Sequence, residues 1–388
     1  MASTGFIECI RREIRTLTSR RMYLFGMVVV PVFAALFFVG LLSPGLPLKV
    51  PTAIVDLDHS PMSRSVTRSL DALELVDINA DAESYDDALA AVRRGDIFGF
   101  FVIPANFESE ALAGRTPTLE YYTNMTYFVP GTLAFKGFKT VAVSTSGAVV
   151  RNTLVDLGVD PEGIGALVQP VAVQEYGIGN PWMNYSIYLS PSFAFCTFVL
   201  MIMLMTVFSI TMEIKNGTSV GWLATARGRI SVALAGKLLP QTVIFWAVGG
   251  FILWLLFGYE HFPVNGSLWS LAAAMMLTVV ASQAFAVFVC SVVPNPRLAF
   301  SITALFGILS FSFTGFSFPV ESMYGALGVF SYLAPIRYFF LIYINEGLNG
   351  APLYFSRLYF AALIAFPLVC SLLLFRLRKA CLKPVYVP

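Results

Sequence analysis

Charge is scarce in this sequence. Only 12% of its 388 residues are charged, about half the share found in soluble domains. Hydrophobic residues make up 57% of the chain, and many stand in runs of about 20 residues, the length that crosses a bilayer as a helix. The composition excludes a soluble globular protein and indicates a polytopic membrane protein.

The motifs of nucleotide and catalytic sites are also missing. A phosphate loop needs GxxxxGK[ST], and the nearest string, SVALAGKL, has Ser231 at the first glycine position and Leu238 at the last. HExxH and paired cysteine ligands do not occur. If the chain moves a solute uphill, we expect another subunit to supply the energy.

Six apolar runs predict six transmembrane helices. Their interiors contain no Asp, Glu, Lys or Arg, which argues against an ion-coupled transporter. The predicted spans are 22–42, 186–212, 238–258, 268–293, 298–318 and 356–375.

Basic residues predict the orientation of these spans. The N-terminus, the 213–237 loop, the turn after the fourth span and the C-terminus hold fourteen Lys and Arg against three Glu. Such flanks are cytoplasmic, so both termini are predicted inside and residues 43–182 outside. The first span reads as a retained anchor rather than a cleaved signal peptide. No cysteine falls in 43–182, so no disulfide is expected there.

Residues 1–21 precede the first span and predict a cytoplasmic amphipathic helix in the membrane interface. Ile7, Ile10, Ile14 and Leu17 recur at helical spacing with arginines between them. A frayed basic tail is the alternative.

Residues 43–182 predict an extracytoplasmic mixed α/β domain. Strand-like TAIVDLD, LVDINA, IFGFFVIP and PTLEYYTN alternate with helical segments, and VAVQEYG is a further candidate strand. Ser60 and Pro61 mark one helix start, and Gly95 marks a helix end. Asp56, Asp58 and His59 fit a polar strand-to-helix turn better than a metal or phosphate site, because no second histidine lies in this domain.

Two stretches near the C-terminal spans are candidates for the transport path and for a hairpin. Aromatic and hydroxyl side chains suit an amphipathic substrate, although helix packing explains them equally well. The candidate path residues are Phe193, Phe306, Phe313, Thr314 and Phe316. Residues 319–350 are too apolar for a free loop and contain Glu321, Arg337 and Glu346, so an external re-entrant hairpin is predicted.

The loop EIKNGTSVGWLATARGR, residues 213–229, predicts a short cytoplasmic helix. Thr218 is a candidate cap, and Val220, Leu223 and Ala224 give the helix an apolar stripe. Trp222 is predicted to be exposed and to plug into a groove on a partner protein.

Five stretches, in order along nearly the whole chain, resemble the permease subunit of type-2 ABC exporters with a large extracytoplasmic domain. The 213–229 loop is similar to RExxxGTxxxLLxTPxxR, and GKLLP to GKxxP. TAIVDLDHSPMSRSV, RRGDIFGFFVIPANFESEALAG and GFSFPVESM with SYLAPIRYFF resemble three further motifs. Lys215, Val220, Trp222, Ala226 and Tyr324 depart from these patterns, which leaves the docking contacts open.

The resemblance implies a six-helix permease that dimerises with a second copy or a paralogue and rests on ABC ATPase subunits. These would carry the ATP and Mg²⁺, and this chain would bind no cofactor, metal or nucleic acid. Residues 213–229 would be the coupling helix, and drugs, lipophilic metabolites or lipid-linked molecules the substrates. In a cell with two membranes the protein would lie in the inner one, and its external domain would meet a periplasmic adaptor and an outer-membrane channel. The coupling residues that follow are Glu213, Gly217, Thr218, Val220, Trp222, Leu223, Thr225 and Arg227.

A membrane-anchored receptor or a secretion scaffold that transports nothing is the competing hypothesis. Copurification of an ATPase subunit would distinguish the exporter from both.

Overall fold

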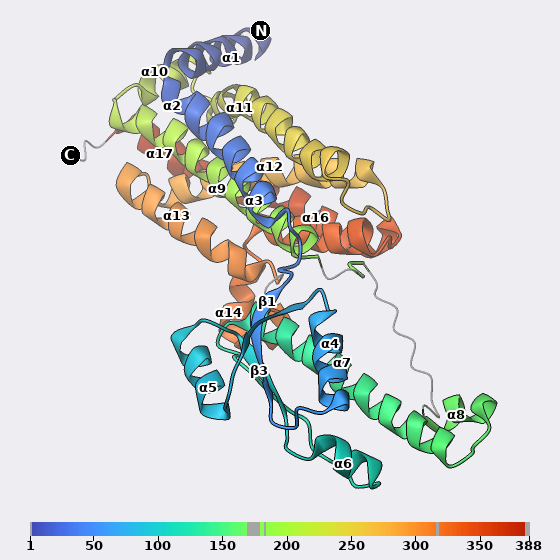
Figure 1. Ribbon diagram of the computed structural model, residues 1–388. Coiled ribbons are helices and arrows are strands. Elements are labelled where there is room, and N and C mark those ends of the chain that lie inside the picture. Colours follow the sequence, from blue (N-terminus) through green and yellow to red (C-terminus); the bar gives the residue numbers. More distant parts are fainter. Residues whose placement is uncertain (1, 169–178, 182–183, 316–317, 385–388) are drawn as a thin grey trace. The chain divides into compact units, whose positions relative to one another are not determined.

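The computed structural model describes residues 2–168, 179–181, 184–315 and 318–384. The chain divides into a helical unit, Met1–Gly45 with Gly177–Pro388, and an α/β unit, Leu46–Tyr176 (Figure 1).

Six helices of the described residues are long and apolar enough to cross a membrane. They agree with the predicted spans to within a few residues, except that the third begins eight residues earlier, at Ile230. The spans are Arg21–Leu42 (α2, a π-helical segment and α3), Tyr185–Lys215 (α9), Ile230–Tyr259 (α11 and a π-helical segment), Leu268–Val292 (α12), Pro296–Phe313 (α13) and Leu353–Ser371 (α16).

The centre of the helical unit is formed by α9 and α12. In their most apolar windows 67% and 72% of residues are buried, against 22% in α13 and 17% in α16. Helix α9 packs against α3, α12 and α13, and Gly26 and Gly307 let neighbouring helices approach its methionine and leucine side chains closely. The exposed apolar faces of α13 and α16 are therefore available to lipid.

Shorter helices complete this unit. They are α1 (Ala2–Ser19), α10 (Ser219–Thr225), α14 (Gly325–Ser331), α15 (Pro335–Ile342) and α17 (Leu374–Leu382). Helix α14 and the helix running from Pro335 to Leu348 are bent by 82° at a short break, the geometry of a broken span or a re-entrant loop. The predicted external hairpin at 319–350 stays a prediction, and Arg337 and Glu346 within it are buried.

The α/β unit is built on one four-stranded sheet with the order β2-β1-β3-β4. The strands are β1 (Val50–Asp56), β2 (Val76–Asp81), β3 (Gly99–Ile103) and β4 (Glu120–Thr123). Strand β1 pairs in parallel with β2 and β3, while β4 is antiparallel to β3. Parallel neighbours require helical crossovers, which α4 (Pro61–Asp71) and α5 (Tyr85–Arg94) supply.

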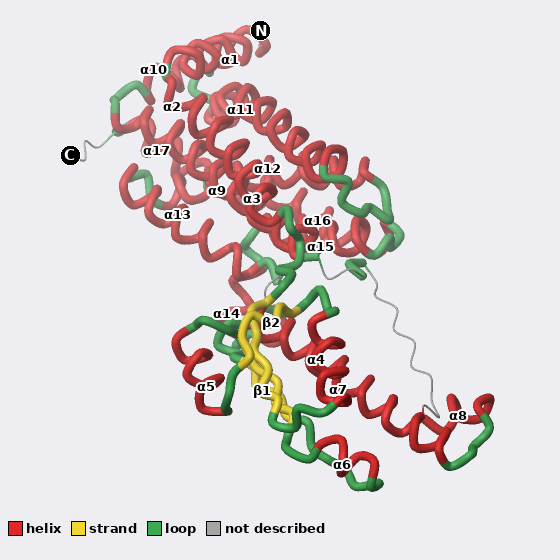
Figure 2. The backbone as a smooth tube through the Cα atoms, in the orientation of Figure 1, coloured by secondary structure: helices red, strands yellow, loops and turns green. Residues whose placement is uncertain are grey.

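Helices cover both faces of the sheet. Ile54 and Phe101 pack with α4 and with α7 (Phe128–Asp156), whereas Val55 and Phe100 pack with α5. Figure 2 shows α5 on one side of the strands and α4 and α7 on the other. Strands buried on both faces are continuously apolar, which is why the sequence pattern located them. Two further helices, α6 (Phe107–Leu112) and α8 (Pro161–Val168), complete the unit.

Local signals placed the ends of these elements correctly. Ser60 caps α4 by accepting a hydrogen bond from the Ser63 amide, and Gly95 ends α5 with φ +84°. Asp56 accepts hydrogen bonds from the amides of Asp58 and His59, so these residues form the predicted polar turn. The candidate strand VAVQEYG, residues 171–177, lies outside the described residues.

Candidate functional site

The candidate site lies at the end of the helical unit where α1, α10 and α17 gather (Figure 1). Helix α10 contacts α1, α9, α11 and α17. The predicted coupling loop is therefore packed onto two of the longest spans, α9 and α11.

Helix α1 lies directly against α11 because Gly236 has no side chain. A Cβ atom at Gly236 would stand 2.5 Å from the Cβ of Cys9 and 3.2 Å from the carbonyl oxygen of Phe6. A Cβ at Gly5 would stand 3.0 Å from the Thr225 carbonyl oxygen in α10. These two glycines allow α1 to touch both α10 and α11.

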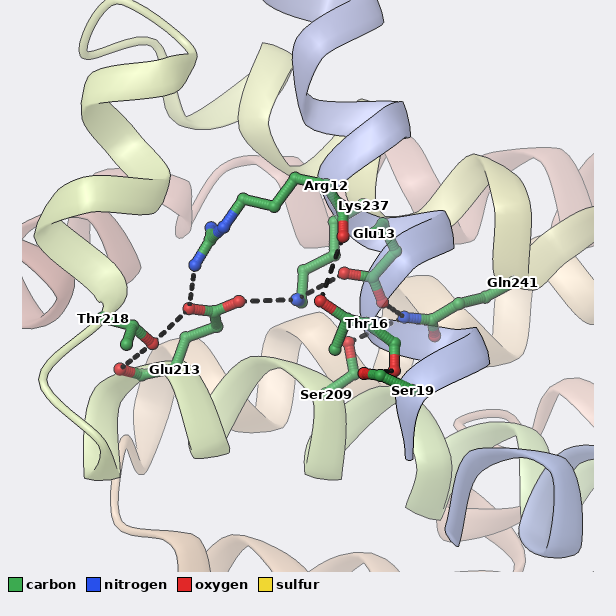
Figure 3. Close-up of polar contacts among 9 residues, drawn as sticks. All are labelled: Arg12, Glu13, Thr16, Ser19, Ser209, Glu213, Thr218, Lys237 and Gln241. Carbon is green, nitrogen blue, oxygen red and sulfur yellow. Dashed lines mark hydrogen bonds and ion pairs between the residues drawn. The ribbon is translucent and has the colours of Figure 1, made fainter. Parts of the chain in front are cut away.

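Lys237 lies at the centre of a buried ionic cluster. Its Nζ atom donates to Glu13 Oε2 of α1 at 2.8 Å and to Glu213 Oε1 of α9 at 3.0 Å. The lysine and Glu13 are each 2% exposed, and Glu213 is 8% exposed. Figure 3 shows both carboxylates directed at the ammonium group. One lysine of α11 therefore joins the N-terminal helix to the end of α9.

Polar neighbours complete this cluster, which we define as Arg12, Glu13, Glu213, Lys237 and Gln241. Arg12 Nη2 donates to Glu213 Oε2 at 2.8 Å. Gln241 Nε2 bonds Glu13 Oε1 at 2.8 Å and Ser209 Oγ at 2.7 Å (Figure 3). The cluster contains two cations and two carboxylates and is neutral in sum, which is the condition for burying charges at tolerable cost.

The ionic cluster corrects the expectation that the spans contain no ionisable residue. The predicted third span starts at residue 238, but the helix begins at Ile230, so Lys237 lies inside it. The helix tolerates this lysine because Glu13 and Glu213 supply the opposite charge.

Trp222 is buried, so the prediction that it is exposed is wrong. The side chain is 1% exposed, and Lys237 Nζ lies 5.3 Å from its ring centroid, within the range of a cation–π contact. Trp222 and Leu223 anchor α10 to the bundle, while Val220 is 46% exposed and Ala224 is also exposed. The predicted apolar stripe is thus divided between an inner and an outer face.

Thr218 occupies the N-cap position of α10, but its side chain does not cap the helix. Its hydroxyl group donates to the Glu213 carboxylate instead, which ties the start of α10 to the end of α9. Gly217 has φ +68°, a left-handed conformation that glycine adopts without strain. Thr225 is half-buried, and Arg227 is exposed with φ +53°.

Helix α17 holds the other side of α10. Ser219 Oγ donates to the Cys381 carbonyl oxygen at 2.8 Å. Burial raises the pKa of the Cys381 thiol to about 12, and the nearby Glu213 carboxylate also raises it. This thiol is therefore a packing group and not a reactive one.

The predicted interfacial residues lie on two sides of α1. Ile7 and Ile14 are 52% and 48% exposed, whereas Ile10 and Leu17 are half-buried. An adjacent face, with Cys9 and Glu13, packs into the protein. Helix α1 is thus amphipathic as predicted, and its polar Glu13 is on the buried side.

Two of the candidate path residues each stack on an aromatic ring that is not itself a candidate. Phe193 stacks on Phe311 of α13 at 4.9 Å, whereas Phe306 stacks on Phe285 of α12 at 4.4 Å. Phe313 is half-buried, and Thr314 is buried. Phe316 lies outside the described residues. These contacts are typical of helix packing.

Sequence reasoning missed Glu13, Lys237 and Gln241. Lys237 stood within the GKLLP motif, and its position inside a motif was a signal that it does more than mark the cytoplasmic side. Glu13 stood at position i+4 from Cys9, on a face adjacent to the isoleucines, but nothing local identified its partner.

Six membrane-spanning helices, an α/β unit after the first span and a short helix locked to two spans define a multi-pass membrane protein of the permease class. The family model for ABC-2 family transporter proteins matches residues 21–376, and the chain belongs to this family. It is a membrane component of an ABC transporter, the kind of component that associates with an ABC ATPase. No curated protein matches the chain.

Proposed function

We propose that the chain is the permease subunit of an ATP-driven exporter and that α10 is its coupling helix. The ionic cluster supports this most strongly. It ties the base of α10 to α1, α9 and α11 through Glu213 and Lys237. An ATPase that pushes on α10 would therefore move two spans.

The transmission path follows from the contacts of α10. Thr218 is hydrogen-bonded to Glu213 at the end of α9, and the Trp222 ring contacts the ammonium group of Lys237 in α11. A buried charge network resists separation because an unpaired charge in an apolar interior costs several kcal/mol. The network thus favours movement of α10 together with α9 and α11 as one rigid body, rather than local deformation of the loop.

The exposed residues of this region define where the ATPase would dock. Val220 and Ala224 form the outer face of α10, and Asn216 and Gly217 precede it. Two residues that depart from the family pattern are exposed here, Lys215 at the end of α9 and Val220 on the outer face of α10. They would contact an ATPase surface that is matched to them. ATP and Mg²⁺ would bind only to the ATPase, and this chain would hold no cofactor.

The orientation and the assembly complete the proposal. Both termini and α10 would be cytoplasmic in the inner membrane, the α/β unit extracytoplasmic, and two permeases would form the pathway. The exported substrate would be lipophilic or amphipathic, because the spans offer aromatic and aliphatic surfaces. An adaptor and an outer-membrane channel are further partners for the α/β unit.

The test places a charge on the outer face of α10. Val220→Asp should lower retention of the ATPase subunit in pull-downs at least tenfold, since about 1.4 kcal/mol of lost binding energy corresponds to one decade. Val155→Asp in α7 is the matched control, because Val155 is 49% exposed against 46% for Val220.

Both variants should insert at the wild-type level, because neither side chain is buried. Equal ATPase retention by the two variants would exclude α10 as the docking helix. Failure of the wild-type chain to retain any ATPase would favour the receptor or scaffold hypothesis.

A further inference from the structure

A second feature of the helical unit lies beside the coupling region and is not used by it. A cavity of about 720 Å³ opens between the end of α9, the α12–α13 turn and α17. Its lining consists of Ile214, Ser291, Val292, Pro294, Asn295, Phe375, Arg376, Lys379, Ala380 and Lys383.

The cavity is strongly basic. Arg376, Lys379 and Lys383 follow one another at spacings of three and four, so they share one side of the C-terminal segment. All three are exposed, and no ion pair to them occurs among the described residues. The lining contains no acidic residue. The cavity therefore presents three uncompensated positive charges.

Part of the cavity lining is apolar. This part includes Ile214 at the end of α9, Val292 at the end of α12 and Phe375 on α17, and Phe375 is 67% exposed. An exposed phenylalanine costs free energy in water and gains it when an apolar chain covers it. The cavity thus combines a site for negative charge with a surface for hydrocarbon.

The position of the cavity in the fold supplies the third observation. Span α9 ends at Lys215, α12 ends at Val292 and α13 begins at Pro296. The cavity lies where three spans end, which is the level of the headgroup layer in a bilayer. Asn295 caps α13, whose N-terminus adds partial positive charge at this point.

We propose that this cavity binds an anionic phospholipid. Its phosphate group would lie among Arg376, Lys379 and Lys383, and an acyl chain would cover Phe375 and Val292. Basic pockets between membrane helices suit such headgroups. An acidic peptide could satisfy the charges, but it would leave the apolar lining residues uncovered.

The lipid would also act on α10. It would hold α17 against α9 and α12, and the bond from Ser219 Oγ to the Cys381 carbonyl oxygen carries this position to α10. The lipid would then favour the docked arrangement of the coupling helix. The binding itself depends only on the membrane location and not on the proposed transport function.

Native mass spectrometry of the purified full chain, titrated with phosphatidylglycerol and separately with phosphatidylcholine, tests the proposal. We expect the wild-type protein to retain phosphatidylglycerol at least tenfold better. The triple variant Arg376→Gln, Lys379→Gln, Lys383→Gln should lose this preference, since each basic side chain near an anionic lipid contributes about fivefold. The preference should also shrink at high salt, because screening shortens the range of exposed charges.

The matched control removes three other exposed charges at the same end of the unit, with Arg11→Gln, Arg15→Gln and Arg229→Gln. This control should retain phosphatidylglycerol like the wild type. The charge-conserving variant Arg376→Lys, Lys379→Arg, Lys383→Arg should do so too, which separates loss of charge from loss of folding.

Three outcomes would overturn the proposal. The first is equal retention of both lipids by the wild-type chain, and the second is full retention by the triple Gln variant. The third is displacement of phosphatidylglycerol by millimolar inorganic phosphate, which would identify a site for soluble anions instead. ATPase docking is absent from this assay, so failure here leaves the proposed function standing.

Discussion

Lys237→Met is the sharpest test of the ionic cluster. Methionine keeps an unbranched apolar chain beside Trp222 but removes the ammonium group that bridges Glu13 and Glu213. Removing one partner of a buried ion pair typically costs about 3–5 kcal/mol. Glu13 keeps its bond from Gln241, and Glu213 keeps Arg12, so we expect the lower end, about 3 kcal/mol.

Hydrogen exchange of the α1 amides measures this loss where it occurs. Exchange through local opening reports the free energy that holds α1 on α11. A loss of about 3 kcal/mol would speed exchange around Cys9 by about a hundredfold. Lys215→Met is the matched control, because Lys215 is an exposed lysine at the end of α9, and it should change exchange by less than about twofold.

The double variant Glu13→Gln, Lys237→Met adds a second criterion. It restores neutrality around the remaining Arg12–Glu213 pair, so we expect it to be less destabilised than Lys237→Met alone. A double variant that loses as much as the two single variants together would refute coupling between these side chains. Equal exchange in Lys237→Met and Lys215→Met would refute the argument altogether.

Three further outcomes follow from the same structure. Trp222→Ala should lower the free energy of unfolding by about 3–5 kcal/mol, as for other buried aromatics. Thermal denaturation of the purified chain measures this loss, and an unchanged midpoint would contradict it. Burial raises the pKa of the Cys381 thiol to about 12, so this thiol should resist maleimide at neutral pH, and rapid labelling of the folded protein at pH 8 would contradict its burial. Because the thiol pKa is higher in the folded than in the unfolded chain, the contribution of Cys381 to stability is full below the ordinary thiol pKa and is lost as the pH rises towards 12. In whole cells with a permeabilised outer layer, an impermeant thiol reagent should label Ser84→Cys but not Asn216→Cys, and the reverse pattern would overturn the proposed orientation.

Much of the architecture was predictable because its causes are local. A run of about 20 apolar residues has few stable alternatives to a membrane helix, so the six spans were located from the sequence. Ser60 and Gly95 act within one helical turn of their own position, and the helix boundaries at these residues were accordingly visible. The family resemblance also depended on short motifs, and the family match supports it.

The candidate site was predictable only in part. The 213–229 loop and Glu213, Gly217 and Thr218 were selected from motif positions, but the interior or exterior location of each side chain was not. Trp222 was predicted to be exposed because it stands in a short cytoplasmic loop between two spans. Its burial depends on α11 and α17, which pack against α10 from elsewhere in the chain.

The sequence by itself determined that this protein is a six-span membrane protein with an α/β unit after the first span, because hydrophobic length and strand–helix alternation act over short stretches of chain. Only the tertiary structure decided that Lys237 is a buried bridge. Glu13 lies 224 residues from Lys237 along the chain, and Glu213 lies 24 residues away. A charged side chain is buried at tolerable cost only where a group of opposite charge lies beside it. The packing of α1, α9 and α11 places Glu13 and Glu213 beside Lys237.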